Sequence, residues 1–185
     1  NPVFSGMFMS LIGFGFLGGI SGVMMGTEQL HMIVHNTLYV PGHFHATVVA
    51  GTTLAFMAIS YLLVPLVFRR ELVMTKVAQL QPWLFGLGVM GSSLFMMGAG
   101  TLGVARRHWD ITFADATLHF QYPSAAFLMM ALNGISGIIA FIGGAMFVAV
   151  IVGSLLFGRK LGENENAVPF GMARTSVVGR YGGYE

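Results

Sequence analysis

Four long apolar stretches constrain this chain more than any other feature of its sequence. Each is at least about 20 residues long with almost no charge, which is what an α-helix needs to cross the hydrocarbon core of a bilayer. Of the 185 residues, 55% are hydrophobic and only 9% are charged, a balance typical of an integral membrane protein. We predict an all-α membrane protein with transmembrane helices at about residues 3–25, 41–68, 80–104 and 123–157, followed by a polar tail over 158–185.

The composition also excludes several classes of protein. Without cysteine, the chain can form neither a disulfide nor a thiolate metal site. A formal net charge of +2 is too small to suggest a nucleic acid partner. The sequence opens Asn1-Pro2-Val3 directly before an apolar stretch and without a charged leader, so we expect a segment of a longer polypeptide.

The basic residues predict the orientation of the helices. Seven of the nine Lys and Arg residues lie either between the second and third predicted helices or in the tail. Two helices separate these segments, so they share one side of the membrane, and the positive-inside rule assigns that side to the cytoplasm. Residues 26–40 and the adjacent Arg106 and Arg107 then lie on the outer side, with His43 and His45 a short way into the membrane from the outer face.

Two histidines, His43 and His45, flank Phe44 at the head of the second apolar stretch. Residues two apart on an α-helix diverge by about 200°, so the two imidazoles cannot chelate one small ion together. Such a pair suits two separate centres, and haem is the best candidate because its macrocycle is apolar and its iron takes a single axial histidine. The alternative is a pair of imidazoles that only form hydrogen bonds with neighbouring residues, although ionisable groups inside membranes are functional by default.

Two adjacent arginines, Arg106 and Arg107, run against the charge bias of the outer side. Haem propionates would favour them there, because guanidinium groups pair with carboxylates in a bidentate geometry. The alternative is a solvated loop. A haem-bearing site on the outer side would explain both the histidine pair and the arginine pair.

The stretch "HNTLYVPGHFH", followed by an apolar helix and about sixty residues later by "RRHWD", resembles subunit I of the haem–copper oxidases. "NTLYVPGHFH" is most similar to the prokaryotic B-type branch, the cytochrome c or quinol oxidases. The resemblance covers nearly the whole chain. It implies that the four helices, beginning with "NPVF" and a glycine-rich stretch, are the ninth to twelfth helices of a twelve-helix fold.

This resemblance implies roles for individual residues. His43 would be the axial ligand of the high-spin haem, where oxygen is reduced, and His45 an axial ligand of the low-spin haem, which passes electrons to it. Arg106 and Arg107 would hold the haem propionates. His35 and Asn36 would lie in the polar, water-rich region above the propionates.

Two positions near that region differ from residues that are common among relatives. The A-type oxidases commonly have an aspartate where this chain has Asn36, and that aspartate helps to hold Mg²⁺; a neutral amide gives no reason to expect this metal. The family usually carries an aspartate four residues before His35, where this chain has His31. An imidazole differs from a carboxylate in charge and proton affinity, so an outer proton-loading role cannot be transferred directly.

The resemblance also implies cofactors and partners beyond this chain. An active-site copper is expected, ligated by histidines of earlier helices, together with a second histidine for the low-spin haem. Expected partners are the remainder of subunit I, a subunit II with or without a copper A site, cytochrome c or quinol as electron donor, and the lipid of a prokaryotic plasma membrane. The implied function is reduction of O₂ to water, coupled to electron transport and proton translocation.

Three alternatives remain open at this point. A nitric oxide reductase uses the same scaffold and differs at active-site residues outside this chain. A non-enzymatic di-haem electron carrier would need the same two ligands but no open iron site. A haem-free transporter is the least favoured, because the histidines lie near one membrane face and the helices lack interior charges.

Overall fold

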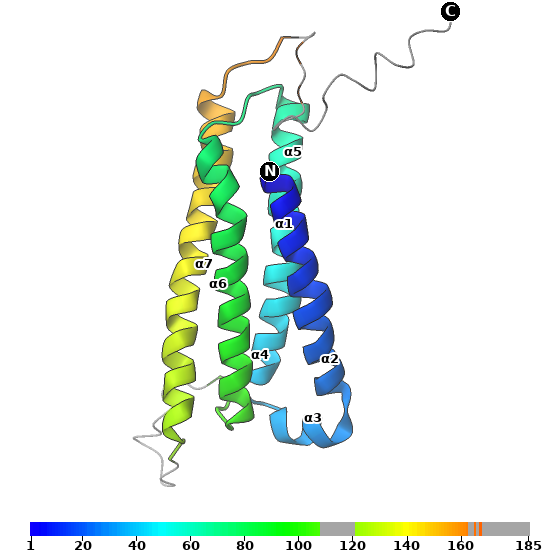
Figure 1. The fold of residues 1–185 in the computed structure, drawn as a ribbon, viewed down its shortest axis with the longest axis vertical. Helices are drawn as coiled ribbons and strands as arrows, with labels where there is room; N and C mark the ends of the chain where they lie inside the picture. The colour runs from blue at the N-terminus through cyan, green and yellow to red at the C-terminus, as the bar shows by residue number, and fades with distance from the viewer. Residues whose placement is uncertain (108–120, 163–164, 166, 168–185) are drawn as a thin grey trace, which may run out of the picture.

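The computed structural model describes residues 1–107, 121–162, 165 and 167. Within them the chain forms an elongated bundle of helices without a strand (Figure 1). Four helical rods are long and apolar enough to cross a membrane, namely Pro2–Gly26, Tyr39–Phe68, Thr75–Thr101 and Ser124–Phe157. The prediction of an all-α membrane protein with four spanning helices is confirmed. Of the predicted polar tail, only residues up to 162 and residues 165 and 167 are described.

The first two rods are each divided by a π-helical segment, whereas the last two are continuous α-helices. In chain order the elements are α1 (Pro2–Leu11), η1 (Ile12–Gly18), α2 (Gly19–Gly26), α3 (Glu28–Val34), α4 (Tyr39–Phe44), η2 (His45–Thr53), α5 (Leu54–Phe68), α6 (Thr75–Thr101) and α7 (Ser124–Phe157), where η denotes a π-helix.

The third rod begins earlier than its apolar pattern indicates. The residues from Thr75 to Gln79 are helical and extend α6 by one turn beyond the apolar stretch. Pro82, which the sequence places near a helix start, therefore lies inside α6, as Pro65 lies inside α5. Both prolines are buried, so neighbouring helices hold the backbone in place where an internal hydrogen bond is missing.

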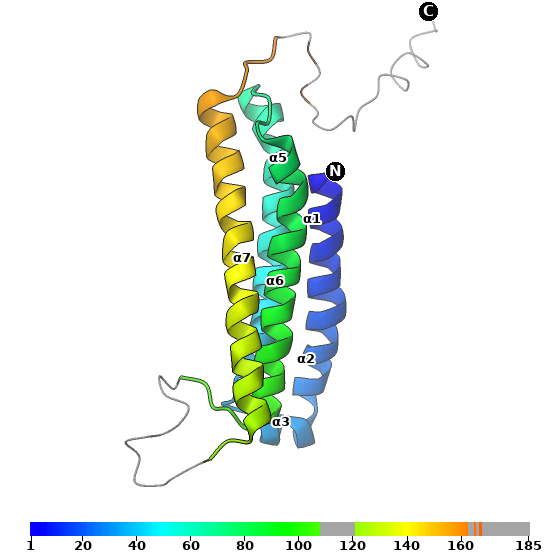
Figure 2. The same ribbon diagram turned by 60° about the vertical axis from the view of Figure 1, so that its left-hand side comes forward.

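Glycines set the distance between α6 and α7, the most extensive pair of neighbours (Figure 2). A Cβ added at Gly88 would lie 2.8 Å from the Cα of Ala140, and one at Gly143 would lie 2.7 Å from the Cα of Phe85. Only a residue without a side chain allows backbones to approach this closely. Close packing of this kind replaces the hydrophobic effect as the main attraction between helices in lipid.

The two π-helices η1 and η2 pack against each other in the middle of the first two rods. A Cβ at Gly13 in η1 would lie 2.7 Å from the Cβ of Ala50 in η2, and Ser10 Oγ donates a 2.7 Å hydrogen bond to the carbonyl oxygen of Gly51. π-Helical turns are rare in proteins, and many of those that do occur lie at functional sites. Here the second one begins at His45.

Each end of the bundle is closed by a short antiparallel contact between loops. Thr37 pairs with Ala105 at one end, and Arg70 pairs with Lys160 at the other. In Figure 1 these ends are the bottom and top of the bundle, so the head of the histidine helix and the arginine pair lie at the same end. This is the arrangement that one shared site requires.

A buried polar pair ties the second rod to α6. The hydroxyl of Tyr61 donates a 3.0 Å hydrogen bond to Gln81 Oε1, and both side chains are fully buried. We predict that Tyr61→Phe lowers the free energy of unfolding by about 1–3 kcal/mol, because the amide oxygen loses its donor. Thermal unfolding in nanodiscs measures this. A Tyr61→Phe/Gln81→Met double variant should recover part of the loss, and an unchanged Tm in the single variant would contradict the assignment.

Candidate functional site

His43, on α4, faces the first rod. Its Nδ1 lies 2.9 Å from the hydroxyl oxygen of Ser21 on α2. The imidazole ring packs over Gly22, where an added Cβ would lie 3.1 Å from the ring Cε1. Two neighbouring residues of α2 thus contact one imidazole, Ser21 through a hydrogen bond and Gly22 through its backbone.

His45, at the first position of η2, faces the other way. Its Nδ1 lies 2.8 Å from the carbonyl oxygen of Pro41. A carbonyl only accepts, so the proton is on Nδ1 and the lone pair is on Nε2. The imidazole lines a pocket of about 300 Å³ with residues of η2, α6 and α7, among them Val49, Phe85 and Phe141.

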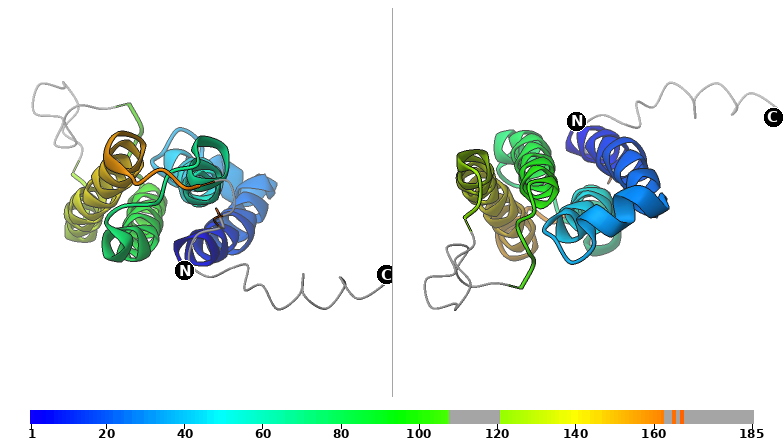
Figure 3. Two further views of the ribbon diagram at one scale, coloured as in Figure 1. Left: turned by 90° about the horizontal axis from the view of Figure 1, so that it is seen from above. Right: turned by 90° about the horizontal axis from the view of Figure 1, so that it is seen from below.

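The two imidazoles therefore lie on different flanks of one rod. Seen along the bundle axis, α4 stands between α2 on one side and α6 with α7 on the other (Figure 3). Phe44 lies between the two histidines in sequence and is 55% exposed, with its ring centroid 5.9 Å from that of His43. Among residues 1–107 and 121–162, no three His, Asp or Glu side chains are arranged to hold one metal ion.

Arg106 is held beside the head of the histidine helix by backbone hydrogen bonds. Its N–H donates to the carbonyl oxygen of Asn36 (2.9 Å), and the N–H of Leu38 donates to the carbonyl oxygen of Val104 (2.8 Å). These two bonds flank the bridge between Thr37 and Ala105, which lies two residues before the start of α4. The contact between the two loops thus fixes where the guanidinium can reach.

The guanidinium of Arg106 is only partly satisfied. Its Nη2 donates a 2.8 Å hydrogen bond to Asn36 Oδ1. Its Nε is buried and has no hydrogen-bond partner among the described residues. A buried N–H without an acceptor costs about 1–3 kcal/mol, so this donor is suited to an acceptor that the chain itself does not provide. Asn36 adopts a left-handed backbone (φ 61°), which asparagine tolerates better than most residues.

The other predicted residues lie nearby but are more exposed. Arg107 is exposed with φ 69°. His35 caps α3 and is exposed, as is His31 one turn earlier; their ring centroids are 5.0 Å apart. The segment between the first two rods is thus helical around His31. The last three residues of the "RRHWD" motif, 108–110, lie outside the described residues.

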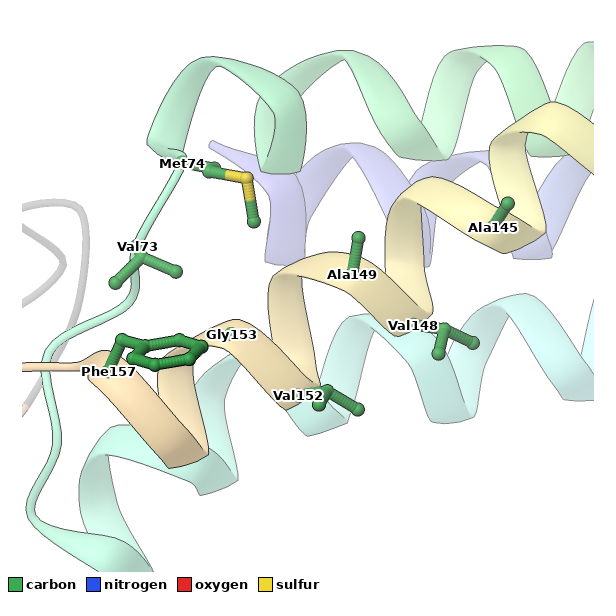
Figure 4. A pocket seen from close by; sticks show the side chains of 8 residues that line it. All are labelled: Val73, Met74, Ala145, Val148, Ala149, Val152, Gly153 and Phe157. Atoms are coloured by element: carbon green, nitrogen blue, oxygen red, sulfur yellow. The ribbon is translucent and has the colours of Figure 1, made fainter.

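A larger apolar hollow lies near the far end of α7 and is not part of this site (Figure 4). It measures about 800 Å³ and is lined only by apolar residues, including Val73, Val148 and Phe157. Its lining holds no ionisable side chain, and the thioether of Met74 is its single potential metal ligand. The candidate site is therefore the end of the bundle that holds His43, His45 and Arg106.

Sequence reasoning missed two features of the site. Ser21, 22 residues before His43, gives no sequence signal of its own, because serine is common in closely packed membrane helices. The side-chain hydrogen bond between Asn36 and Arg106 joins residues 70 apart. Both features depend on tertiary contacts that periodicity and spacing do not reveal.

The fold and the site define a multi-pass membrane protein with two histidines on opposite flanks of one helix. Residues 2–142 match the family model described as cytochrome c and quinol oxidase polypeptide I. The chain belongs to this family, whose members are haem–copper oxidase subunits I.

Individual relatives agree with this assignment. The chain is 32% identical over 92% of its length to cytochrome c oxidase subunit 1 of Thermus thermophilus, of which it spans 30%. It is 32% identical over 61% of its length to cytochrome c oxidase polypeptide 1 of Halobacterium salinarum, of which it spans 19%. The chain thus spans less than a third of either relative.

A solved structure shows the same fold. A cryo-EM structure of a haem–copper terminal oxidase dimer matches 91% of this chain and 31% of its own chain, with a TM-score of 0.76 and 28% sequence identity. The four rods therefore have the arrangement found within a terminal oxidase chain.

Proposed function

We propose that this chain is part of the catalytic subunit of a terminal oxidase, in which His43 ligates the high-spin haem and His45 the low-spin haem. The observation that carries the proposal is the placement of two imidazoles on opposite flanks of one rod. His45 lines a pocket between helices with its lone pair on Nε2, and His43 is held by α2 on the other side.

The residues present fit haem as the bound group. Each flank offers a single imidazole, as an axial ligand requires. The His45 pocket is apolar apart from the imidazole and Ser92, which suits a macrocycle, and the orphaned Nε of Arg106 suits a carboxylate such as a propionate. When bound, the haems supply electron transfer and, together with copper held by residues outside this chain, the reduction of O₂ to water.

The chain's own contribution is to position the side chains that would hold the haems and to keep water away from them. The Pro41 carbonyl fixes the tautomer and ring orientation of His45. Asn36 fixes the guanidinium of Arg106, and we place Arg107, His35 and Asn36 around the propionates. Packing of α6 against α4 and α7 excludes water from the helix interior, which strengthens electrostatic interactions with bound groups.

We also assign the chain to the B-type branch, on the basis of the "NTLYVPGHFH" sequence. This branch implies cytochrome c or quinol as electron donor, proton translocation, and a prokaryotic plasma membrane as location. The rest of subunit I and a subunit II would complete the enzyme. The charge distribution supports His43 and His45 near the outer face and a cytoplasmic tail.

A gas-consumption experiment on the purified complex tests the reaction. The reduced complex should consume O₂ and bind carbon monoxide at a high-spin haem. Turnover of nitric oxide with none of O₂ would favour a nitric oxide reductase instead. Purely six-coordinate low-spin spectra without carbon monoxide binding would favour a di-haem electron carrier, and a preparation without pigment would overturn haem binding altogether.

Replacing Arg106 tests the propionate assignment. We expect Arg106→Leu to lower a haem midpoint potential by tens of millivolts, because removing a positive charge beside the propionates stabilises the oxidised, more positive iron. Spectroscopic redox titration measures this. Arg70→Leu is the matched control, because Arg70 donates to the Gly158 carbonyl at the opposite end of the bundle. If the haem midpoint potentials of Arg106→Leu and the wild type were equal, the assignment of Arg106 to a propionate would be wrong.

A further inference from the structure

Ser21 is the described side chain that hydrogen-bonds the His43 imidazole, and it is buried (3% exposed). Its hydroxyl oxygen has three close polar neighbours: the carbonyl oxygens of Leu17 at 2.7 Å and Gly18 at 3.1 Å, and Nδ1 of His43 at 2.9 Å. A hydroxyl has one proton and two lone pairs. The position of that proton decides the tautomer of His43.

The two carbonyls determine the direction of the hydrogen bonds. Carbonyl oxygens only accept, so the Ser21 proton points to Leu17, the nearer of the two, or is shared with Gly18. If Ser21 instead donated to His43, its lone pairs would face two carbonyl oxygens within 3.1 Å without a proton between them. The Gly18 carbonyl also lies within hydrogen-bonding reach of the His43 imidazole and, like every carbonyl, only accepts. Nδ1 of His43 therefore carries the proton and points toward Ser21 and Gly18, and the lone pair of His43 lies on Nε2.

We infer that Ser21 is a positioning residue for His43, which sets both the orientation and the electron-donor strength of the imidazole toward the iron. This inference rests on the proposed function. The chain of hydrogen bonds from Nδ1 through the hydroxyl to the Leu17 carbonyl polarises each member. A partner on the remote nitrogen of a ligating histidine raises its basicity toward the metal and fixes its ring.

Gly22 completes the constraint on the ring. Its missing side chain allows His43 to lie against α2, because a Cβ there would lie 3.1 Å from Cε1. Two consecutive residues of α2 thus hold the His43 ring: Ser21 forms a hydrogen bond with it, and the backbone of Gly22 packs against it. Ser21 is further held through its backbone, since the hydroxyl of Tyr39 donates to its carbonyl oxygen at 3.4 Å.

Resonance Raman spectroscopy of the reduced, intact complex tests the inference, because the iron–histidine stretching frequency reports donor strength directly. We expect Ser21→Ala to retain the high-spin haem but to shift this band to lower frequency by several wavenumbers. Ser21→Thr, which keeps the hydroxyl, should restore it. Ser154→Ala is the matched control: Ser154 is also buried and donates to a carbonyl four residues earlier (2.6 Å), but lies at the far end of α7.

The possible results separate this inference from the proposed function. An unchanged band in Ser21→Ala, or a Ser21→Thr variant that behaves like Ser21→Ala, would overturn the role of Ser21 while leaving haem ligation intact. A wild-type complex without an iron–histidine band would instead overturn the proposed function. If Ser21→Ala fails to assemble, Ser21→Thr and Ser21→Cys still decide the question, because a thiol accepts hydrogen bonds more weakly than a hydroxyl and should give an intermediate shift.

Discussion

His45→Ala should abolish the low-spin haem signal and leave carbon monoxide binding intact, whereas His43→Ala should do the reverse. The reason is geometric: His45 lines the pocket toward α6 and α7, and His43 contacts Ser21 and Gly22 on α2. Each substitution removes one axial bond from one flank. Optical difference spectra of the purified complexes, with and without carbon monoxide, measure both signals in each variant.

His31→Ala is the matched control for this pair of variants. His31 lies at the same end of the bundle but is exposed, within α3, and has no assigned contact with either haem. The variant should retain both haem signals. If His43→Ala and His45→Ala removed the same signal, the assignment of one haem to each flank would be wrong.

Gly100→Val should prevent both haems from being incorporated. A Cβ at Gly100 would lie 2.7 Å from the Cα of Tyr39, the first residue of α4. Backbone cannot move aside as a flexible side chain can, so the substitution must push α6 away from the histidine helix. Overpacking costs about 1–3 kcal/mol where side chains can adjust, and we expect at least about 3 kcal/mol here. Pigment content after purification measures the outcome.

Gly134→Val serves as its control. Gly134 lies within α7, and a Cβ there meets no atom of the described residues within 4 Å. It introduces the same β-branched residue into a membrane helix without the clash. Normal pigment content in Gly100→Val would show that α4 and α6 need not touch for the site to form.

A hydrogen bond joins the same two helices close to Gly100. Ser93 Oγ on α6 donates a 2.6 Å hydrogen bond to the carbonyl oxygen of Gly42, the residue before His43. Gly42 is itself closely packed, since a Cβ there would lie 2.7 Å from Met97 Cγ. The histidine helix is therefore fixed against α6 through its backbone, which leaves both imidazoles free to lie on its flanks.

The fold could be predicted largely from the sequence because the bilayer imposes a length and an apolar composition on every spanning helix. That criterion finds the four rods but not their polar ends, and so it does not find the start of α6 at Thr75. Nor does it reveal π-helices, because apolar composition does not distinguish η1 and η2 from the helices that they interrupt. In the structure the two π-helices meet where Gly13 packs closely against Ala50.

The candidate site was only partly predictable for a related reason. His43 and His45 are conspicuous because ionisable side chains are costly in lipid. Arg106 is conspicuous because it opposes the charge bias. The residues that orient them, Ser21 and Asn36, are ordinary in composition and act through contacts between distant segments. The sequence therefore indicates the candidate ligands, and the structure indicates the residues that hold them.

The most direct test of the central claim is a density map of the intact complex at a resolution that separates the imidazole rings. The account predicts two tetrapyrroles, one against His45 between η2, α6 and α7, and one against His43 on the side of α2, each with its iron on an Nε2. A single shared ion between the two histidines, or no tetrapyrrole beside either of them, would contradict it.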